Sequence, residues 1–287
     1  MANLPDAAGI AWVNGQLTPA GQATLPLLDH GITVGDGVFE AMRVIGGQAF
    51  ALTRHLRRMA RSASGLGLEF PGDLVRRAVV EVLAANAERL NGPVDVVRVT
   101  LTAGLGRIGS GRLPGSRPSV FALVSSHDLE PAETSVITVP FTRNERGALA
   151  GLKTISYAEN ALALSLAQAA GASEAIFGNT VGRLTEGTGS NVFLGMGGRL
   201  VTPPLSDGPL GGVTRNLLLE WTEVEELSVP MAALWEADEV FITSSGRNVQ
   251  AVVAADGRPV GGGRLGPLTA RAADLFAAGQ SQTPDPL

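Results

Sequence analysis

Apolar and polar residues alternate along several short segments of the first half of the chain. Residues 37–44 form a predicted strand whose side chains divide between two faces. A hairpin is predicted over residues 10–17, with Asn14-Gly15 at its turn, and residues 49–52 are expected to return after Gly46-Gly47. On the strand at 37–44, one face carries Phe39, Ala41 and Arg43, and the other carries Val38, Glu40, Met42 and Val44.

The spacing then becomes helical. Apolar residues recur every three or four positions from Leu56 to Leu66, and Pro71 opens a second helical pattern. The β-branched residues of 94–102 predict a strand, and the polar tail from Gln280 is expected to be loose. The other predicted strands are 118–125, 136–141, 174–177, 190–194, 199–202 and 239–244, and the other predicted helices are 161–170, 212–221, 231–236 and 271–278.

A polar segment with a proline, residues 126–133, separates two sets of elements and is a predicted linker. At 287 residues the chain exceeds a typical single domain. We therefore predict an α+β protein with two domains, residues 1–128 and residues 129–287.

Composition narrows the function classes. The net charge of −5 disfavours nucleic acid as a partner, because phosphate backbones bind basic surfaces. The chain has no cysteine, and its three histidines, His30, His55 and His127, lie far apart, so no metal site is expected. Residues 1–10 lack a targeting pattern and no apolar run is long enough to span a membrane, so we expect a soluble cytoplasmic protein.

One lysine and one tyrosine occur in the whole chain, and both lie in residues 151–160, as Lys153 and Tyr157. A desolvated lysine amine can lose its proton and attack a carbonyl, whereas arginine stays protonated. The competing interpretation is compositional drift that left a single lysine. The rest of the chain must decide between them.

A glycine pattern, Gly104-x-Gly106-x-x-Gly109, follows the strand at 94–102 and formally matches a dinucleotide-binding motif. That motif needs a helix to begin at the glycines, so that the N-terminus of the helix meets a pyrophosphate. Residues 110–118 contain glycines and prolines and cannot form such a helix. A flexible loop near a site is the favoured interpretation.

Several motifs occur together in one order and resemble those of the class IV, or fold type IV, pyridoxal phosphate (PLP) aminotransferases. This superfamily includes D-amino acid aminotransferases, branched-chain aminotransferases and 4-amino-4-deoxychorismate lyases. The resemblance spans about residues 10–265, and it implies a smaller N-terminal α/β domain, a larger C-terminal domain with a barrel-like sheet, and a homodimer. The matching segments are residues 28–40, 55–59, 151–160, 182–193, 211–215 and 239–245.

The resemblance also implies roles for individual residues. Lys153 would form the Schiff base with the cofactor and carry the proton of the substrate. Tyr157 would bond the phenolic oxygen of the cofactor, and Glu186 would keep the pyridine nitrogen protonated. The phosphate would be held by Arg58, which the His-x-x-Arg spacing selects, by backbone N–H groups of Val213 and Thr214, and by the hydroxyls of Ser244 and Ser245.

The resemblance further implies a ping-pong reaction in which an amino donor passes its amino group to a 2-oxo acid. The carboxylate of the donor needs a cation. The candidates are Arg43, on the strand face that it shares with Phe39, and Arg98, or else Arg107 or Arg112 in the glycine-rich loop.

None of the three subfamilies matches in full. Arg43 and Arg98 match the branched-chain enzymes, but Val96 replaces their tyrosine. Ala103 replaces the arginine of the D-amino acid enzymes, and the Thr-Thr that follows Phe39 in some lyases is absent. The missing tyrosine and the arginine-bearing loop favour D-amino acids with relaxed specificity, extending to (R)-amines. The L-branched-chain aminotransferase and the lyase are the alternatives.

Overall fold

A computed structural model describes residues 9–287. The expectation that residues 1–10 carry no targeting signal therefore falls mostly outside the described residues. The chain divides into two compact units. The first contains residues up to 129 together with residues 152–156 and 284–287, and the second contains residues 130–151 and 157–283. Within the described part of the chain, no helix is both long enough and apolar enough to cross a membrane.

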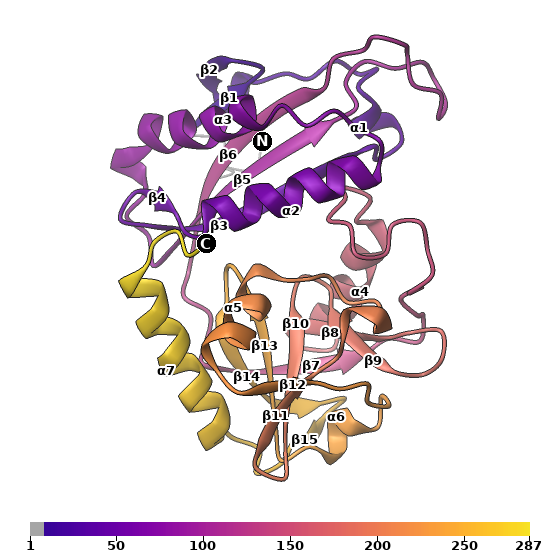
Figure 1. Ribbon diagram of the computed structural model, residues 1–287, viewed down its shortest axis with the longest axis vertical. Helices are drawn as coiled ribbons and strands as arrows, with labels where there is room; N and C mark the ends of the chain where they lie inside the picture. The colour runs from indigo at the N-terminus through magenta and orange to yellow at the C-terminus, as the bar shows by residue number, and fades with distance from the viewer. Residues whose placement is uncertain (1–8) are drawn as a thin grey trace. The chain divides into compact units, whose positions relative to one another are not determined.

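The first unit is built on a six-stranded antiparallel sheet (Figure 1). Its three long central strands pair along their whole lengths, with Phe39 opposite Thr100 and Ala41 opposite Arg98. The strand order is β2 (Gln16–Pro19), β1 (Ile10–Val13), β6 (Ser119–His127), β5 (Val94–Thr102), β3 (Gly37–Ile45) and β4 (Gln48–Ala49).

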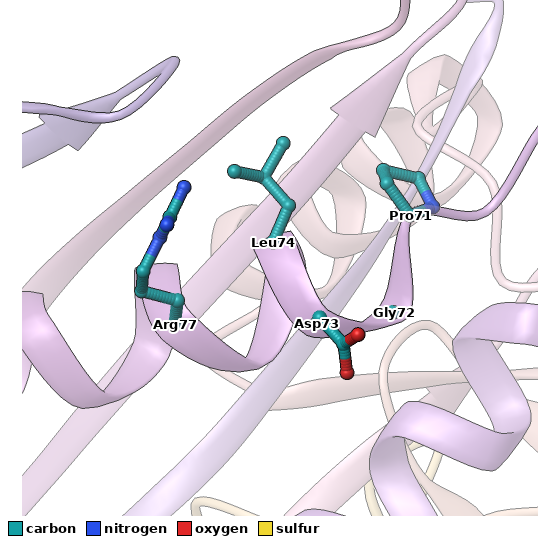
Figure 2. A pocket seen from close by; sticks show the side chains of 5 residues that line it. All are labelled: Pro71, Gly72, Asp73, Leu74 and Arg77. Carbon is teal, nitrogen blue, oxygen red and sulfur yellow. The ribbon is translucent and has the colours of Figure 1, made fainter.

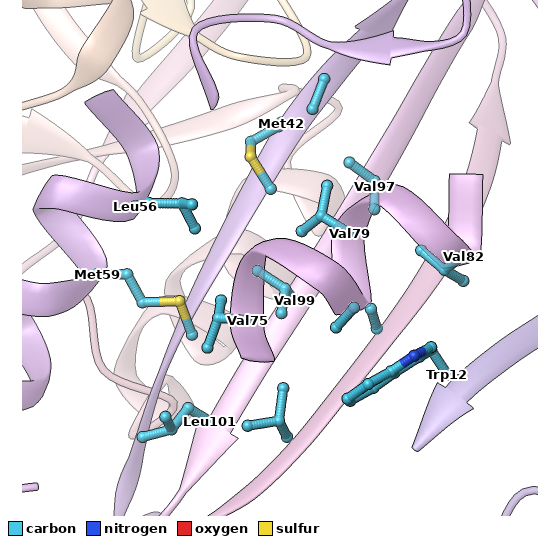
Figure 3. Packing of buried hydrophobic residues seen from close by; sticks show 14 of the residues in the cluster. Trp12, Met42, Leu56, Met59, Val75, Val79, Val82, Val97, Val99 and Leu101 are labelled. Carbon is cyan, nitrogen blue, oxygen red and sulfur yellow. The ribbon is translucent and has the colours of Figure 1, made fainter. Parts of the chain in front are cut away.

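Two helices, α2 (Leu52–Gly65) and α3 (Gly72–Ala85), pack on one face of this sheet. Figure 3 shows Met42 of β3 and Val97 of β5 packed against Val79 of α3. Burying such side chains stabilises the unit by about 1.5–3 kcal/mol each. The predicted alternation of β3 is confirmed, since Val38 and Met42 are fully buried on this face. A short helix, α1 (His30–Thr33), and two 3-10 turns, Ala20–Gln22 and Ala87–Arg89, complete the unit.

The second unit contains a closed barrel. Its nine-stranded sheet closes into a ring of six strands because β9 pairs with β10 through Glu186 and Asn191. The predicted barrel-like sheet is therefore confirmed. The ring order is β10 (Asn191–Met196), β13 (Glu239–Ser244), β14 (Asn248–Ala255), β7 (Glu133–Thr138), β8 (Glu174–Gly178) and β9 (Leu184–Gly187), and the sheet is extended by β11 (Arg199–Thr202), β12 (Val224–Glu226) and β15 (Arg258–Pro259).

Side chains of alternate barrel residues divide between an apolar cluster and the surrounding helices. Val192 and Ile242 belong to the buried cluster, whereas Phe193 and Phe241 stack on each other at 4.7 Å. Trp221 and Phe276 join two of the helices, with ring centroids 5.6 Å apart. The helices are α4 (Ala158–Ala169), α5 (Val213–Trp221), α6 (Ala233–Glu236) and α7 (Pro267–Gln282), with a 3-10 turn at Leu205–Asp207.

Three predicted elements need correction. The return strand at 49–52 shortens to β4, because Ala51 adopts a left-handed conformation (φ 54°) and α2 begins at Leu52. The tail is not loose: α7 continues to Gln282, and Asp285 accepts hydrogen bonds from the backbone and the hydroxyl of Thr53, at 2.8 and 2.6 Å. The predicted linker is partly strand, since β6 continues to His127 and β7 begins at Glu133.

Candidate functional site

Lys153 is held against β3 of the first unit by its backbone. Its carbonyl accepts from Phe39 N–H at 3.2 Å, and its N–H donates to the Ser62 hydroxyl of α2 at 3.0 Å. Ile155 N–H continues this pairing by donating to the Gly37 carbonyl at 2.9 Å. These bonds group residues 152–156 with the first unit, whereas the sequence predicts Lys153 in the C-terminal domain.

An aromatic ring and a second cation lie beside the lysine amine. Lys153 Nζ lies 4.3 Å from the centre of the Phe39 ring, and the Arg98 guanidinium carbon lies 3.7 Å from the same centre. The β3–β5 register produces this arrangement, because Arg98 is opposite Ala41 and therefore diagonal to Phe39 on the same face. The structure thus brings together three residues that the sequence proposes for catalysis and substrate binding.

Arg43 lies at the other end of β3. It donates to the Pro93 carbonyl at 3.3 Å, and burial lowers the pKa of its guanidinium. Arg43 is four positions along the strand from Phe39, a distance of about 13 Å at the usual rise per residue. Of the two strand arginines, Arg98 is the one beside the lysine.

The glycine-rich loop is tied to α1 and the segment that follows it. Arg112 donates to both carboxylate oxygens of Asp36, at 2.7 and 2.6 Å, and this bonding raises the pKa of Arg112. His30 contacts the Arg107 carbonyl at 3.3 Å, while Arg107 itself is exposed. Between Gly104 and β6, a stretch that the structure describes throughout, no helix forms, so the loop does not have the geometry of a dinucleotide site.

Arg58 forms a buried ion pair. Its Nε and Nη2 donate to the two oxygens of Glu40, at 2.8 and 2.6 Å, and His55 Nδ1 lies 2.6 Å from the same carboxylate. Burial alone would raise the pKa of Glu40, but Arg58 and then His55 lower it to about 2. Burial is also the main reason that the pKa of His55 is lowered. Phosphate binding by Arg58 therefore stays a prediction. The same side chain also has a structural partner, Glu40.

Glu186 lies on β9 of the second unit, between a cation and a backbone donor. Arg143 Nε is 3.4 Å from Oε1, and Leu210 N–H donates to Oε2 at 2.8 Å. Arg143 is itself held by the Phe177 ring at 4.2 Å and by Glu159 at 3.0 Å. These two donors hold the Glu186 carboxylate in a fixed position on β9.

The turn after Glu186 is organised around a second carboxylate, Glu174, which is 2% exposed. Thr188 N–H donates to it at 3.0 Å, and the Ser190 hydroxyl donates at 2.9 Å. These bonds fix the path of residues 188–190, which connect β9 to β10. The position of Glu186 is thus set by a buried network rather than by a free turn.

The predicted phosphate segments have the donors that a phosphate needs. Helix α5 begins at Val213, its N-cap is Gly212, and no side chain caps it. The N–H groups of Val213 and Thr214 have no partner within the helix, which makes the helix N-terminus suitable for an anion. Ser244 accepts from Arg247 N–H at 3.1 Å and keeps its hydroxyl proton, and Ser245 follows it at the end of β13. The donor set therefore fits a phosphate group.

A surface hollow at the start of α3 lies elsewhere in the first unit. Figure 2 shows the side chains that line it. None of the predicted site residues is among them, and all come from one short stretch of chain. They are Pro71, Gly72, Asp73, Leu74 and Arg77.

Three contributors to this site carry no clear signal in the sequence. Arg143 belongs to no motif, and the Leu210 backbone cannot be found from side-chain types. Asn191 lies inside the segment 182–193 that carries the resemblance, but the resemblance assigns it no role. Its position next to Glu186 in the β9–β10 pairing becomes visible only with the sheet register.

A fixed lysine in the first unit and, in the second, an acid and an uncapped helix N-terminus are features of PLP enzymes. The family model of amino-transferase class IV matches residues 37–255, and the chain therefore belongs to this family. It is a PLP-dependent aminotransferase, as the sequence predicts.

Relatives carry two kinds of name. The chain is 30% identical over 274 residues to a putative branched-chain-amino-acid aminotransferase of Methanocaldococcus jannaschii, covering 92% of this chain and 94% of the relative. It is 31% identical to a D-alanine aminotransferase of Bacillus licheniformis, covering 89% and 92% of the two chains. The branched-chain aminotransferase of the archaeon Thermoproteus uzoniensis, solved with norvaline, superposes with a TM-score of 0.84 at 27% identity, covering 94% of this chain and 93% of that chain.

Proposed function

We propose that this aminotransferase takes D-amino acids as donors, with relaxed specificity extending to (R)-amines, and passes the amino group to a 2-oxo acid. The observation that supports an amino acid donor is the Arg98 guanidinium over the same Phe39 ring that Lys153 Nζ contacts. It is a cation close to the amine and suited to a substrate carboxylate. Val96 lines the same strand face and leaves it without the tyrosine of the branched-chain enzymes.

Bound PLP supplies an electron sink for the pair released when the donor loses its α-proton. The Lys153 amine accepts that proton and returns it. The Glu186 carboxylate holds the proton on the pyridine nitrogen, and Tyr157 bonds the phenolic oxygen. Donors at the start of α5, with Arg58, Ser244 and Ser245, bind the phosphate.

A second candidate is transamination of L-branched-chain amino acids. Arg43 and Arg98 lie on one face of neighbouring strands, and the resemblance gives the branched-chain enzymes an arginine at each of these two positions. The names of the relatives include both substrate classes. The two candidates share the chemistry at Lys153 and differ only in the donor.

Cofactor attachment is tested first. The purified protein should be yellow, and borohydride should fix the cofactor to the peptide that contains Lys153. A Lys153→Ala variant is the control, and it should carry no label. A colourless protein, or a label elsewhere, would contradict the proposal.

The donor is tested by single-turnover bleaching of the bound cofactor with D-alanine, L-leucine, an (R)-arylamine and aminodeoxychorismate. D-alanine and the (R)-arylamine should bleach it. Arg98→Met should weaken D-alanine binding about 10-fold or more, because a charged hydrogen bond is lost, and should leave the (R)-arylamine, which has no carboxylate, unchanged. Arg43→Met is the matched control and should have a smaller effect. Bleaching by L-leucine alone would establish the second candidate instead.

The homodimer that the resemblance implies, and location in the cytoplasm, belong to the same proposal. Apolar side chains exposed around the loop of the first unit support association, among them Leu27 at 83% and Ile108 at 91% exposure. Covering exposed apolar side chains with a second subunit is favourable, because it removes apolar surface from water. Sedimentation of the holoenzyme should give twice the mass of the chain, and a monomer would contradict this part of the proposal.

A further inference from the structure

Two paired residues at the β9–β10 closure of the barrel bind the backbone of Leu210, in the loop before α5. Glu186 and Asn191 are direct partners in the β9–β10 pairing. Leu210 N–H donates to Glu186 Oε2 at 2.8 Å, and Asn191 Nδ2 donates to the Leu210 carbonyl at 2.8 Å. Glu186 and Asn191 thus bond both backbone polar groups of Leu210. The loop before α5 is thus fixed at one point, three residues ahead of Val213.

Gly212 lies within this contact. A Cβ at this position would lie 2.0 Å from Asn191 Oδ1, a distance that real side chains do not reach. The backbone of Gly212 has φ −62° and ψ 142°, which any residue can adopt. Glycine is therefore required here for space and not for conformation. Asn191 fills the volume above the N-cap of α5.

We propose that Asn191 is a positioning residue for the cofactor phosphate, and that it acts through Leu210 and Gly212. This inference rests on the proposed function, in which the first N–H groups of α5 bind that phosphate. Asn191 is 5% exposed and reaches the phosphate segment only through the backbone. With Asn191 in place, the loop enters α5 by one path, so the N–H groups of Val213 and Thr214 point to one place.

The proposal predicts a loss that is specific to the phosphate. Asn191→Ala removes one buried hydrogen bond and opens the space above Gly212, so the donors at the start of α5 are no longer held in register. The affinity of the cofactor-free protein for PLP should fall about 10-fold. Pyridoxal carries the same aldehyde and ring but no phosphate, and its affinity should change less than about threefold.

The titrations compare the cofactor-free wild type, Asn191→Ala and Asn179→Ala with PLP and with pyridoxal. Asn179 is the matched control, because it is 2% exposed and its amide donates to the Asp207 carbonyl of the same loop at 3.2 Å. Its replacement should leave the ratio of the two affinities unchanged. Equal losses for PLP and pyridoxal in Asn191→Ala, or no loss, would overturn the inference while the proposed function stands. A wild type that binds neither compound would overturn both.

A double substitution gives an independent test. Gly212→Ala should weaken PLP binding about 10-fold in the wild-type background, because the new Cβ displaces Asn191. In the Asn191→Ala background the same change should cost less than about twofold, since the remaining neighbour is Arg215 Cβ at 3.4 Å. Additive losses would refute the proposed contact. Gly212→Ala keeps the test informative if Asn191→Ala does not fold.

Discussion

The buried ion pair of the first unit allows a quantitative prediction. Glu40 is 0% exposed, bonds Arg58 twice, and also contacts His55. The variant Glu40→Gln keeps the shape but removes the charge and one acceptor oxygen. Arg58, at 5% exposure, then lacks its buried counter-charge. Breaking a buried pair from one side costs about 3–5 kcal/mol, and we expect the free energy of unfolding to fall by that amount at pH 7.

The pH dependence gives a second estimate of what the Glu40 charge contributes to the free energy of unfolding. The folded-state pKa of Glu40 is about 2, against an ordinary value of 4.5, because Arg58 and His55 outweigh burial. A lowered folded pKa adds stability that is complete above the unfolded pKa and is lost as the pH falls toward the folded pKa. The difference corresponds to about 3 kcal/mol. The advantage of the wild type over Glu40→Gln should therefore be constant above about pH 5 and shrink between pH 4.5 and 2.

Urea unfolding of the cofactor-free protein at pH 7 and at pH 3.5 measures both effects. Glu225→Gln is the matched control, because its partner Arg199 is 74% exposed and the pair should contribute less than about 1 kcal/mol. A loss below about 1 kcal/mol for Glu40→Gln at pH 7 would refute the argument. A difference between wild type and variant that does not change between the two pH values would refute the pKa of Glu40.

Three further substitutions test other contacts. Asp285→Ala removes the acceptor for Thr53 at the start of α2 and should lower the unfolding free energy by about 1–2 kcal/mol in thermal melts; an unchanged melt would mean that the tail does not cap the helix. Arg112→Met should cost less than about 1 kcal/mol, since Arg112 is 40% exposed, yet it should speed proteolysis of the glycine-rich loop by releasing Asp36; an equal cleavage rate would contradict the loop contact. Gly104→Ala should cost about 2 kcal/mol or more in urea unfolding, because φ is +75° and the new Cβ would lie 1.9 Å from a backbone carbonyl; wild-type stability would refute the loop geometry.

Elements with strong local patterns could be predicted from the sequence. The alternation in β3 and the helical spacing of α2 identify both the element and its buried face, because burial on one side imposes a period on the side chains. Strand β14 is not among the strands predicted from the sequence, because three alanines of low strand propensity interrupt its three valines; its pairing with β13 and β7 holds it in the sheet. The order of C-terminal residues 284–287 also depends on a distant partner, Thr53.

The candidate site divides in the same way. Residues proposed from motifs, such as Lys153 and Glu186, lie in short segments whose spacing is itself the signal. Arg143 and Leu210 reach Glu186 across 43 and 24 positions of sequence, so no local pattern could place them there. Arg58 shows the opposite case. The His-x-x-Arg spacing predicts that Arg58 binds a phosphate, and the fold adds a buried partner, Glu40. The alternation along β3 predicts the face on which Glu40 lies but not its contact with Arg58.

Substrate specificity is the least predictable feature for a physical reason. Whether Arg98 or Arg43 lies beside the lysine depends on the register of β3 against β5, and a slip of one residue would move each side chain to the other face. The register that forms places Arg98 diagonal to Phe39, where its guanidinium and Lys153 Nζ share one ring. The role proposed for Arg98 toward a donor carboxylate rests on this register, since the neighbouring position on that face of β5 is the apolar Val96. The handedness of the donor then depends on which side of the amine the remaining substituent occupies, and no spacing along the chain encodes that choice.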